Sequence, residues 1–231
     1  MITGETVSAD TLKRLAASVD LIWQRVRKSV KAKRDEEEFA KAKNEIEELK
    51  KRQKKGAVDI FYFDETGFDL QPAVPYAWQP KGEMIEVPSS KSARLNTLGF
   101  LNTENCDFQC YTFECAVDSE IVTACFDRFS EYIDKEKQTF VIIDNASVHT
   151  SYKFIVKIEE WKEKGLFIIY LPPYSPELNL IEILWRFIKY SQLPFSAYLS
   201  FENFVKEAEN ILKGVGSEYI ISVWPKNILI Q

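Results

Sequence analysis

Two short apolar runs that each end in an aspartate constrain the fold of this chain more than any other feature. The run before Asp64 reads IFYFD, and the run before Asp144 reads FVIID. Uninterrupted apolar runs of this length are typical of strands that are buried on both faces of a sheet. Ligand sites in open α/β sheets form at the carboxyl ends of such strands. The sequence therefore predicts that Asp64 and Asp144 each end a buried strand at one edge of a sheet.

The order of the remaining segments indicates an α/β fold with a mixed central sheet flanked by helices. Two further strands are expected over residues 94–103 and 108–117, before the strand that ends at Asp144. Apolar residues at helical spacing alternate with strands after that point, so that the order becomes α-β-α-β-α-α. A chain of 231 residues allows one medium domain and a smaller appendage.

The N-terminal part differs in composition from the rest. Residues 8–29 have apolar residues at helical spacing, with Ser8 or Asp10 as possible N-caps. Many basic residues lie in the first 34: Lys13, Arg14, Arg25, Arg27, Lys28, Lys31, Lys33 and Arg34. The segment is either a solvated amphipathic helix or the remnant of a helix-turn-helix DNA reader. These basic residues favour DNA binding by the N-terminal segment, whereas the net charge of −5 for the whole chain argues mildly against DNA binding.

Three domains follow from these shifts in composition. Residues 1–34 are the first, with N-terminal helices that precede the core as either a solvated segment or the remnant of a helix-turn-helix DNA-binding domain. Residues 35–56 are almost entirely charged, with acids first and bases last, as a helix dipole prefers. They are expected to form a charged, solvated helical linker that ends at Gly56 and carries no chemistry. Residues 57–231 are expected to form the main α/β domain.

A third acid, Glu182, completes a set of candidate ligands. It lies in the first turns of an expected helix that follows three prolines, and it is either a paired core acid or a ligand that faces the sheet. Taken singly, each acid can also be an ordinary turn or helix-start residue. Together, Asp64, Asp144 and Glu182 are hard oxygen ligands of the kind that Mg²⁺ and Mn²⁺ prefer. Two such ions can stabilise the attacking and leaving oxygens of a phosphodiester.

Several other classes of protein lack support in the sequence. The four cysteines form no close pair, so reduced core thiols are favoured over a zinc site. No GxxxxGK[ST] or GxGxxG motif is present to bind a nucleotide. No long apolar run and no signal-peptide core occur, so we expect no membrane association and a cytoplasmic location.

Four stretches together resemble the mariner superfamily of DDE transposases, especially its bacterial insertion-sequence branch. They read FYFDETGFDLQP, YAWQPKGE, VIIDNASVHTS and LPPYSPELNLIEILWRFIK, occur in the family's order and span about residues 57–190. In this resemblance Asp64, Asp144 and Glu182 match the catalytic, metal-binding triad. It implies that residues 57–231 form a catalytic domain with a ribonuclease-H-like core that binds two Mg²⁺ or Mn²⁺ ions. It also implies hydrolysis at transposon ends, followed by attack of the freed 3′-hydroxyl on target DNA without a covalent protein–DNA intermediate.

The resemblance also implies partners and supporting residues. The partners are double-stranded DNA, as terminal inverted repeats and as target, and a second copy of the chain in a homodimer. Asn145 and His149 match a motif near the second aspartate, and His149 is expected either to orient a phosphate or metal-bound water or to be structural. Trp78 and Lys81 match a hairpin near Pro80–Gly82 that approaches DNA, although Trp78 can also be plain core. Trp185 is expected to anchor the helix of Glu182.

Two departures from the family pattern leave alternatives open. Leu180 replaces a proline before the last helix, which we expect to be tolerated. Full-length relatives begin with two helix-turn-helix units, so this chain is expected to be truncated or split from an upstream frame. The function is therefore either active transposition or that of a non-transposing remnant that binds DNA or subunits. A ribonuclease-H-like nuclease for hybrids or junctions is a third hypothesis, which the YSPELNLIEILW block disfavours.

Overall fold

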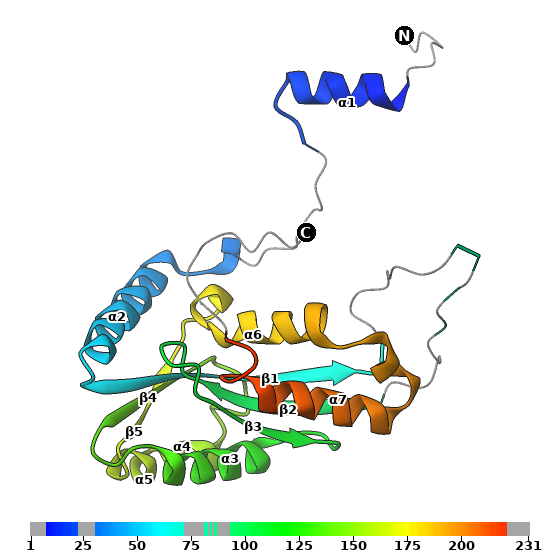
Figure 1. Ribbon diagram of the computed structural model, residues 1–231. Coiled ribbons are helices and arrows are strands. Elements are labelled where there is room, and N and C mark those ends of the chain that lie inside the picture. The colour runs from blue at the N-terminus through cyan, green and yellow to red at the C-terminus, as the bar shows by residue number, and fades with distance from the viewer. Residues whose placement is uncertain are drawn as a thin grey trace. The chain divides into compact units, whose positions relative to one another are not determined.

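The computed structural model in Figure 1 describes residues 8–22, 31–71, 81, 82, 84, 86 and 93–220. The chain divides into two compact units, Met1–Ala32 and Lys33–Gln231. The first unit contains helix α1 (Ala9–Ser18), and the second contains the sheet and the remaining long helices. Each unit is described by itself.

Helix α1 is shorter than the sequence pattern predicts. The side chain of Ser8 caps it by accepting a hydrogen bond from the backbone N–H of Thr11, as expected. The helix ends at Ser18, where the chain turns with Asp20 in the left-handed region at φ 57°. Aspartate tolerates this conformation better than most residues, so the turn ends the helix before residues 23–30, which lie outside the described part. No residue of α1 is buried.

The second unit alternates strands and helices in the predicted order. Its strands are β1 (Val58–Asp69), β2 (Arg94–Leu101), β3 (Phe108–Phe113), β4 (Gln138–Ile143) and β5 (Leu166–Tyr170). Its α-helices are α2 (Glu36–Lys54), α3 (Ser119–Tyr132), α4 (Tyr152–Ile155), α5 (Ile158–Glu163), α6 (Ile181–Phe187) and α7 (Phe201–Gly214). Short 3₁₀ segments are η1 (Lys31–Lys33), η2 (Pro176–Leu178) and η4 (Phe195–Leu199), and η3 (Ile188–Gln192) is a π-helical continuation of α6.

The five strands form one mixed sheet in the order β3-β2-β1-β4-β5. The pairs β1–β2 and β2–β3 are antiparallel, whereas β1–β4 and β4–β5 are parallel. Strand β1 is therefore central, and its residues alternate between two covered faces. The predicted α/β class with a mixed central sheet is confirmed.

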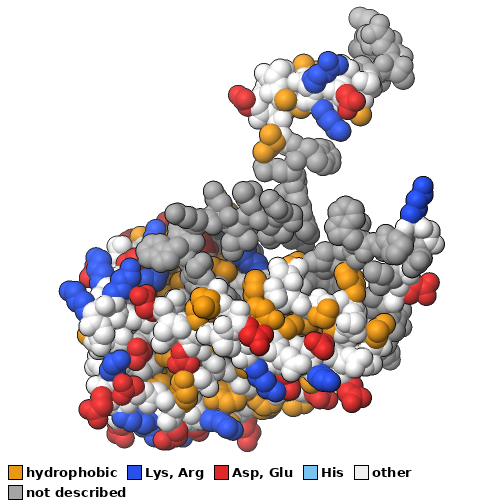
Figure 2. Space-filling view, viewed as in Figure 1, with side chains coloured by type: hydrophobic (Ala, Val, Ile, Leu, Met, Phe, Trp, Pro, Cys, Tyr) orange, Lys and Arg blue, Asp and Glu red, His pale blue; other side chains and the backbone are white. Residues whose placement is uncertain are grey.

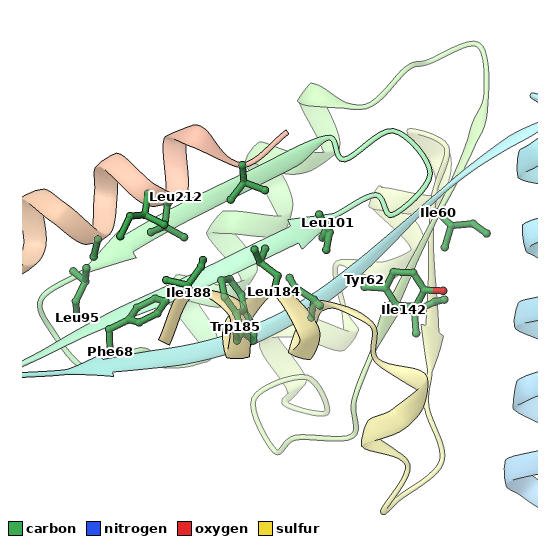
Figure 3. Close-up of a cluster of buried hydrophobic side chains, with 14 of the residues drawn as sticks. Ile60, Tyr62, Phe68, Leu95, Leu101, Ile142, Leu184, Trp185, Ile188 and Leu212 are labelled. Carbon is green, nitrogen blue, oxygen red and sulfur yellow. The ribbon is translucent and has the colours of Figure 1, made fainter. Parts of the chain in front are cut away.

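Each face of the sheet has its own core. On one face, β1 contributes Ile60, Tyr62 and Phe68 to a cluster with residues of α2, α6 and α7, which we call the cavity face (Figure 3). On the other face, Phe61 and Phe63 pack with residues of α3, α4 and α5, which we call the aromatic face. Figure 1 shows these two groups of helices on opposite sides of the strands. The unit is thus built of three layers.

Helix α2 begins and ends where the sequence predicts, but it is more than a solvated linker. The side chain of Asp35 caps its start, and Gly56 follows its end with φ 73°. Ile46 and Leu49 are buried against β1 in the cavity-face core. Most of the other positions are charged and exposed, whereas Phe39 and Ala42 are half-buried, and Figure 2 shows basic side chains gathered over this helix. The expectation of a fully solvated helix is wrong because two apolar side chains, one turn apart, anchor it to the sheet.

The cysteines and the longer helices bear on two further expectations. None of the four cysteines, all of which lie in the described part of the chain, forms a disulfide; Cys106 and Cys125 are buried, while Cys115 is exposed. The description as core thiols therefore holds for two of the four. Among the described residues, no helix combines the length and the hydrophobicity needed to span a bilayer.

Candidate active site

A cavity of about 310 Å³ opens at the edge of the sheet where β4 and β5 end. The three predicted acids, Asp64, Asp144 and Glu182, all line it. Asn145, Asn179 and the loop at residues 171–176 form the rest of the wall. The structure thus brings together three carboxylates that are far apart in the sequence.

The register of β1 and β4 explains why the two aspartates meet. Tyr62 is paired with Ile142 in the parallel ladder, and each aspartate follows two residues later. Asp144 comes directly after β4 ends, as predicted. Asp64 does not end its strand, because β1 continues to Asp69 by pairing with β2. Only the parallel pairing with β4 ends before Asp64, and this leaves the side of β1 next to Asp64 open to the cavity.

Glu182 is held at the cavity by the helix that follows the proline loop. It lies in the first turn of α6, after Leu180, which occupies the N-cap position without a side-chain cap. Trp185 is buried and packs edge-on against Phe68 at 6.2 Å between ring centroids. A Cβ atom at Gly99 would lie 2.6 Å from the Trp185 ring, so the helix approaches the sheet too closely for any other residue there. The ring thus fixes the distance between α6 and the sheet.

Two asparagine side chains tie the acid-bearing segments together. Asn179 donates from Nδ2 to the carbonyl oxygen of Phe63 at 2.9 Å, which links the start of α6 to the residue before Asp64. Asn145 donates from Nδ2 to the carbonyl oxygen of Leu171 at 2.8 Å, which links the segment after β4 to the segment after β5. Asn145 was predicted as a supporting residue, whereas Asn179 was not.

His149, the only histidine of the chain, does not line the cavity. Its side chain is 2% exposed, and Nδ1 lies 2.9 Å from Oδ1 of Asp144. Nε2 lies 3.5 Å from Oε1 of Glu65, and the ring packs between Phe63 and Phe154. In this arrangement the imidazole contacts an acid of the cavity instead of facing the cavity itself.

The three cavity acids have different electrostatic environments. Burial raises the pKa of Asp64 to about 7, and repulsion from Asp144 and Glu182 adds to this effect against a backbone hydrogen bond from Glu65. Burial also raises the pKa of Glu182, partly offset by Arg186. The hydrogen bond from His149 lowers the pKa of Asp144 despite partial burial. Burial alone would lower the pKa of His149, but the neighbouring carboxylates of Asp144 and Glu65 raise that pKa to about 9.

The donors fit a divalent cation in chemistry, although they do not yet surround one point. Three carboxylates share one cavity, and burial disfavours the charged form of Asp64, which a divalent cation would favour. Across the described residues, however, no three Asp, Glu, His or Cys side chains are grouped closely enough to hold an ion. Side-chain rotation within the cavity would be needed to complete a coordination shell.

The loop over the cavity is also held from the N-terminal side of the unit. Arg34 forms hydrogen bonds with Glu36 and with Glu177, and its guanidinium lies 3.8 Å from the centre of the Phe39 ring. Tyr174 in the same loop adopts a left-handed backbone conformation with φ 61°. Arg34 was counted among the basic residues available to DNA, but its side chain is 9% exposed and engaged in these ion pairs.

The remaining supporting residues are only partly visible. Trp78 lies outside the described residues. Lys81 is exposed, and the neighbouring Gly82 has φ 93°, as suits a turn at the predicted position. Their contact with DNA stays a prediction.

Sequence reasoning missed Glu65 and Asn179. Strand alternation offered a signal for Glu65, because the residue after a cavity-facing acid must point to the opposite face. Asn179 gave no comparable signal, since its hydrogen bond depends on how the proline loop folds back onto β1.

Comparison with known proteins identifies the protein family to which this chain is similar. Residues 59–204 match the family model of the DDE superfamily endonucleases. The insertion element IS630 uncharacterized 39 kDa protein of Shigella sonnei is 25% identical over 190 residues, which cover 80% of this chain and 52% of that protein. The chain therefore spans about half the length of this curated relative.

Solved structures show the same fold. A Mos1 mariner paired-end complex with Mn aligns with a TM-score of 0.61 and 14% identity, over 94% of this chain and 66% of that chain. A Mos1 transposase paired-end complex with the left transposon end aligns with a TM-score of 0.55 and 16% identity, over 94% and 69%. The predicted ribonuclease-H-like fold is thereby confirmed. Since the family model covers well over half of the chain and includes all three cavity acids, the chain belongs to the DDE superfamily endonucleases.

Proposed function

We propose that this chain is the catalytic part of a transposase, which cleaves DNA at transposon ends and transfers the freed strand into target DNA. One observation carries the proposal: Asp64, Asp144 and Glu182 line one cavity in a member of an endonuclease family. The likeness to a relative from an insertion element and to Mos1 transposase complexes supports DNA as the substrate.

The three acids would hold two Mg²⁺ or Mn²⁺ ions. Bound ions of this kind stabilise charge on the attacking and leaving oxygens of a phosphodiester. Asp64 is suited to ligation because burial disfavours its lone negative charge, so that a cation would favour its ionised form. Asn145 and Asn179 hold the segments that carry the acids at fixed separations. No step requires a covalent bond between protein and DNA.

DNA binding and assembly are parts of the same proposal. Residues 1–34 would contribute DNA contacts through exposed basic residues such as Lys13 and Arg14, and the hairpin with Trp78 and Lys81 would approach the duplex. We also propose that two copies act together as a homodimer. The first unit remains assigned to a helix-turn-helix remnant by sequence pattern alone.

Cleavage of the element's own ends tests the proposal. A labelled duplex carrying the DNA that flanks the gene is incubated with the full chain and Mg²⁺ or Mn²⁺, and nicks are mapped on a sequencing gel. We expect metal-dependent nicks at the ends of an inverted repeat, and none with Asp144→Asn. Asp59→Asn is the matched control, because Asp59 lies on β1 far from the cavity and pairs with Lys137 at 3.8 Å.

Two outcomes would contradict the proposal. Nicks that persist in Asp144→Asn would remove the assigned chemistry from the cavity. Metal binding without any nicking would support the alternative of a non-transposing remnant.

A further inference from the structure

Behind the second cavity acid, a buried histidine lies between two carboxylates. His149 Nδ1 is 2.9 Å from Asp144 Oδ1, and His149 Nε2 is 3.5 Å from Glu65 Oε1. We propose that Glu65 and His149 form a bracket that sets the orientation of the Asp144 carboxylate, with Glu65 acting only through His149. The inference deepens the proposed function and rests on Asp144 being a metal ligand.

The two carboxylate oxygens of Asp144 have different surroundings. Oδ1 accepts from the backbone N–H of Ala146 at 3.0 Å and also faces Nδ1 of His149. Nδ1 of His149 also lies 3.1 Å from the backbone carbonyl oxygen of Asp144. This nitrogen and the backbone N–H of Ala146 are the two protein donors beside Oδ1, which leaves Oδ2 for the cavity that Asp144 lines. Hydrogen bonds that fix one oxygen of a ligating carboxylate orient the other toward the metal.

The Glu65 carboxylate lies on the far side of the imidazole from Asp144. Nε2 of His149 and Oε1 of Glu65 are both buried, and neither has any other hydrogen-bond partner in the described structure. Buried polar atoms are costly unless they are paired. At 3.5 Å the two atoms are slightly beyond hydrogen-bond distance, and each is the partner the other lacks.

Packing leaves the imidazole of His149 little freedom to move from this position. The ring centroid lies 5.5 Å from that of Phe63 and 5.8 Å from that of Phe154. The backbone carbonyl of His149 accepts from the hydroxyl of Tyr170 at 2.8 Å. A small rotation of the ring would break one of its two contacts with carboxylates, so the packing transmits the position of Glu65 to Asp144.

Strand β1 explains why consecutive acids have such different roles. Side chains of Asp64 and Glu65 point to opposite faces of the sheet because strand residues alternate. Asp64 reaches the cavity directly, whereas Glu65 reaches the aromatic face, where His149 lies. Strand β1 thereby contributes Asp64 directly as a ligand, and through Glu65 and His149 it supports Asp144 as a second ligand.

The single histidine makes the bracket measurable without metal or DNA. Protein labelled with ¹⁵N only in histidine gives one pair of ring-nitrogen signals, because the chain contains only one histidine. We expect Asp144→Asn to shift mainly the Nδ1 signal and Glu65→Gln to shift mainly the Nε2 signal. Asp59→Asn, on the same strand and face as Glu65, should shift neither.

The second measurement is the Mn²⁺ affinity of the full chain, determined by isothermal titration calorimetry. Glu65→Gln should weaken binding by about 10-fold, within the range typical for groups that support a ligand. His149→Ala should weaken binding at least as much, and adding Glu65→Gln to it should change nothing further. His149→Asn should recover part of the loss, since its amide can reach Asp144 from the position of Nδ1, whereas His149→Gln should recover less.

The outcomes separate this inference from the proposed function. If Asp144→Asn leaves Mn²⁺ affinity intact, the metal site itself is wrongly assigned. If Asp144→Asn abolishes binding while Glu65→Gln matches wild type in affinity and in both nitrogen signals, the bracket is refuted. Additive losses for Glu65→Gln and His149→Ala would likewise overturn it, because they would mean that Glu65 acts independently.

Discussion

The two faces of the sheet are covered by similar helices, yet their interiors are built differently. The aromatic face contains a continuous set of ring contacts among Phe63, Phe100, Phe126 and Phe154. The ring centroid of Phe126 lies within 5.2 Å of the centroids of four neighbouring rings. On the cavity face, the apolar cluster shown in part in Figure 3 adjoins an open cavity lined by three acids, and Leu171 belongs to both. One face is filled with close-packed rings, and the other leaves space and charge at its edge.

The contrast teaches where stability and chemistry reside in this fold. Close-packed rings stabilise the native state through buried apolar area and dispersion. Clustered carboxylates at a partly buried site cost free energy in the absence of a cation. Substitutions on the two faces should therefore have opposite signatures, with stability lost on one face and function lost on the other.

The largest expected effect is the loss of cleavage in Glu182→Gln. The change removes a charged oxygen while keeping the side-chain volume, so we expect cleavage to fall by at least about 10²-fold with little change in melting temperature. Glu202→Gln is the control, because Glu202 occupies the first turn of α7 but is exposed and away from the cavity. Gel-based nicking and calorimetry measure the two quantities. Cleavage near the wild-type rate would remove Glu182 from the triad.

Phe126→Ala should have the largest effect on stability. Its ring is fully buried and contacts Phe63 and Trp161, so truncation should lower the free energy of unfolding by about 3–5 kcal/mol. Urea unfolding measures this loss, and Mn²⁺ affinity under native conditions should be retained. If metal affinity fell as far as stability, the two faces would not be separable.

Asp64→Asn should stabilise the metal-free protein while abolishing cleavage. Burial raises the pKa of Asp64 to about 7, so the folded state binds a proton more tightly than the unfolded state. Ionised Asp64 therefore destabilises the fold, and this cost grows as pH rises from the unfolded pKa near 4 to the folded value near 7.

At pH 8 the variant should exceed wild type in free energy of unfolding by about 1–3 kcal/mol, and the difference should vanish near pH 4. Urea unfolding in EDTA at both pH values tests the sign. A variant less stable than wild type at pH 8 would mean that Asp64 is satisfied by protein donors and belongs with the structural residues.

The aromatic face and the strands were largely predictable from sequence. The apolar runs around Phe61 and Val141 gave the buried strands, and helical spacing gave α3 and α7, because these patterns depend only on local periodicity. The convergence of Asp64 and Asp144 followed from the rule for strand ends, although β1 in fact continues to Asp69. That continuation depends on antiparallel pairing with β2, which a local pattern does not encode.

The supports of the cavity were much less predictable. Asn179 bonds to a carbonyl more than a hundred positions earlier in the chain, and Arg34 bonds to Glu177 across a still longer separation. Such contacts are fixed by how loops pack, not by periodicity. His149 was singled out, but its contact with Glu65 on the aromatic face emerged only from the three-dimensional arrangement.

The smallest expected stability effect is that of Asn179→Ala, and it tests the boundary between the two faces. The variant loses the bond from Nδ2 to the Phe63 carbonyl, but it also removes a buried Oδ1 that has no hydrogen-bond partner among the described residues. These contributions oppose each other, so the free energy of unfolding should fall by only about 1 kcal/mol. Mn²⁺ affinity should nevertheless fall several-fold, because the tie that holds the start of α6 next to Asp64 is lost. A loss of stability as large as that of Phe126→Ala, with Mn²⁺ affinity at the wild-type value, would contradict this prediction. It would mean that Asn179 has a structural role like that of the residues of the aromatic face.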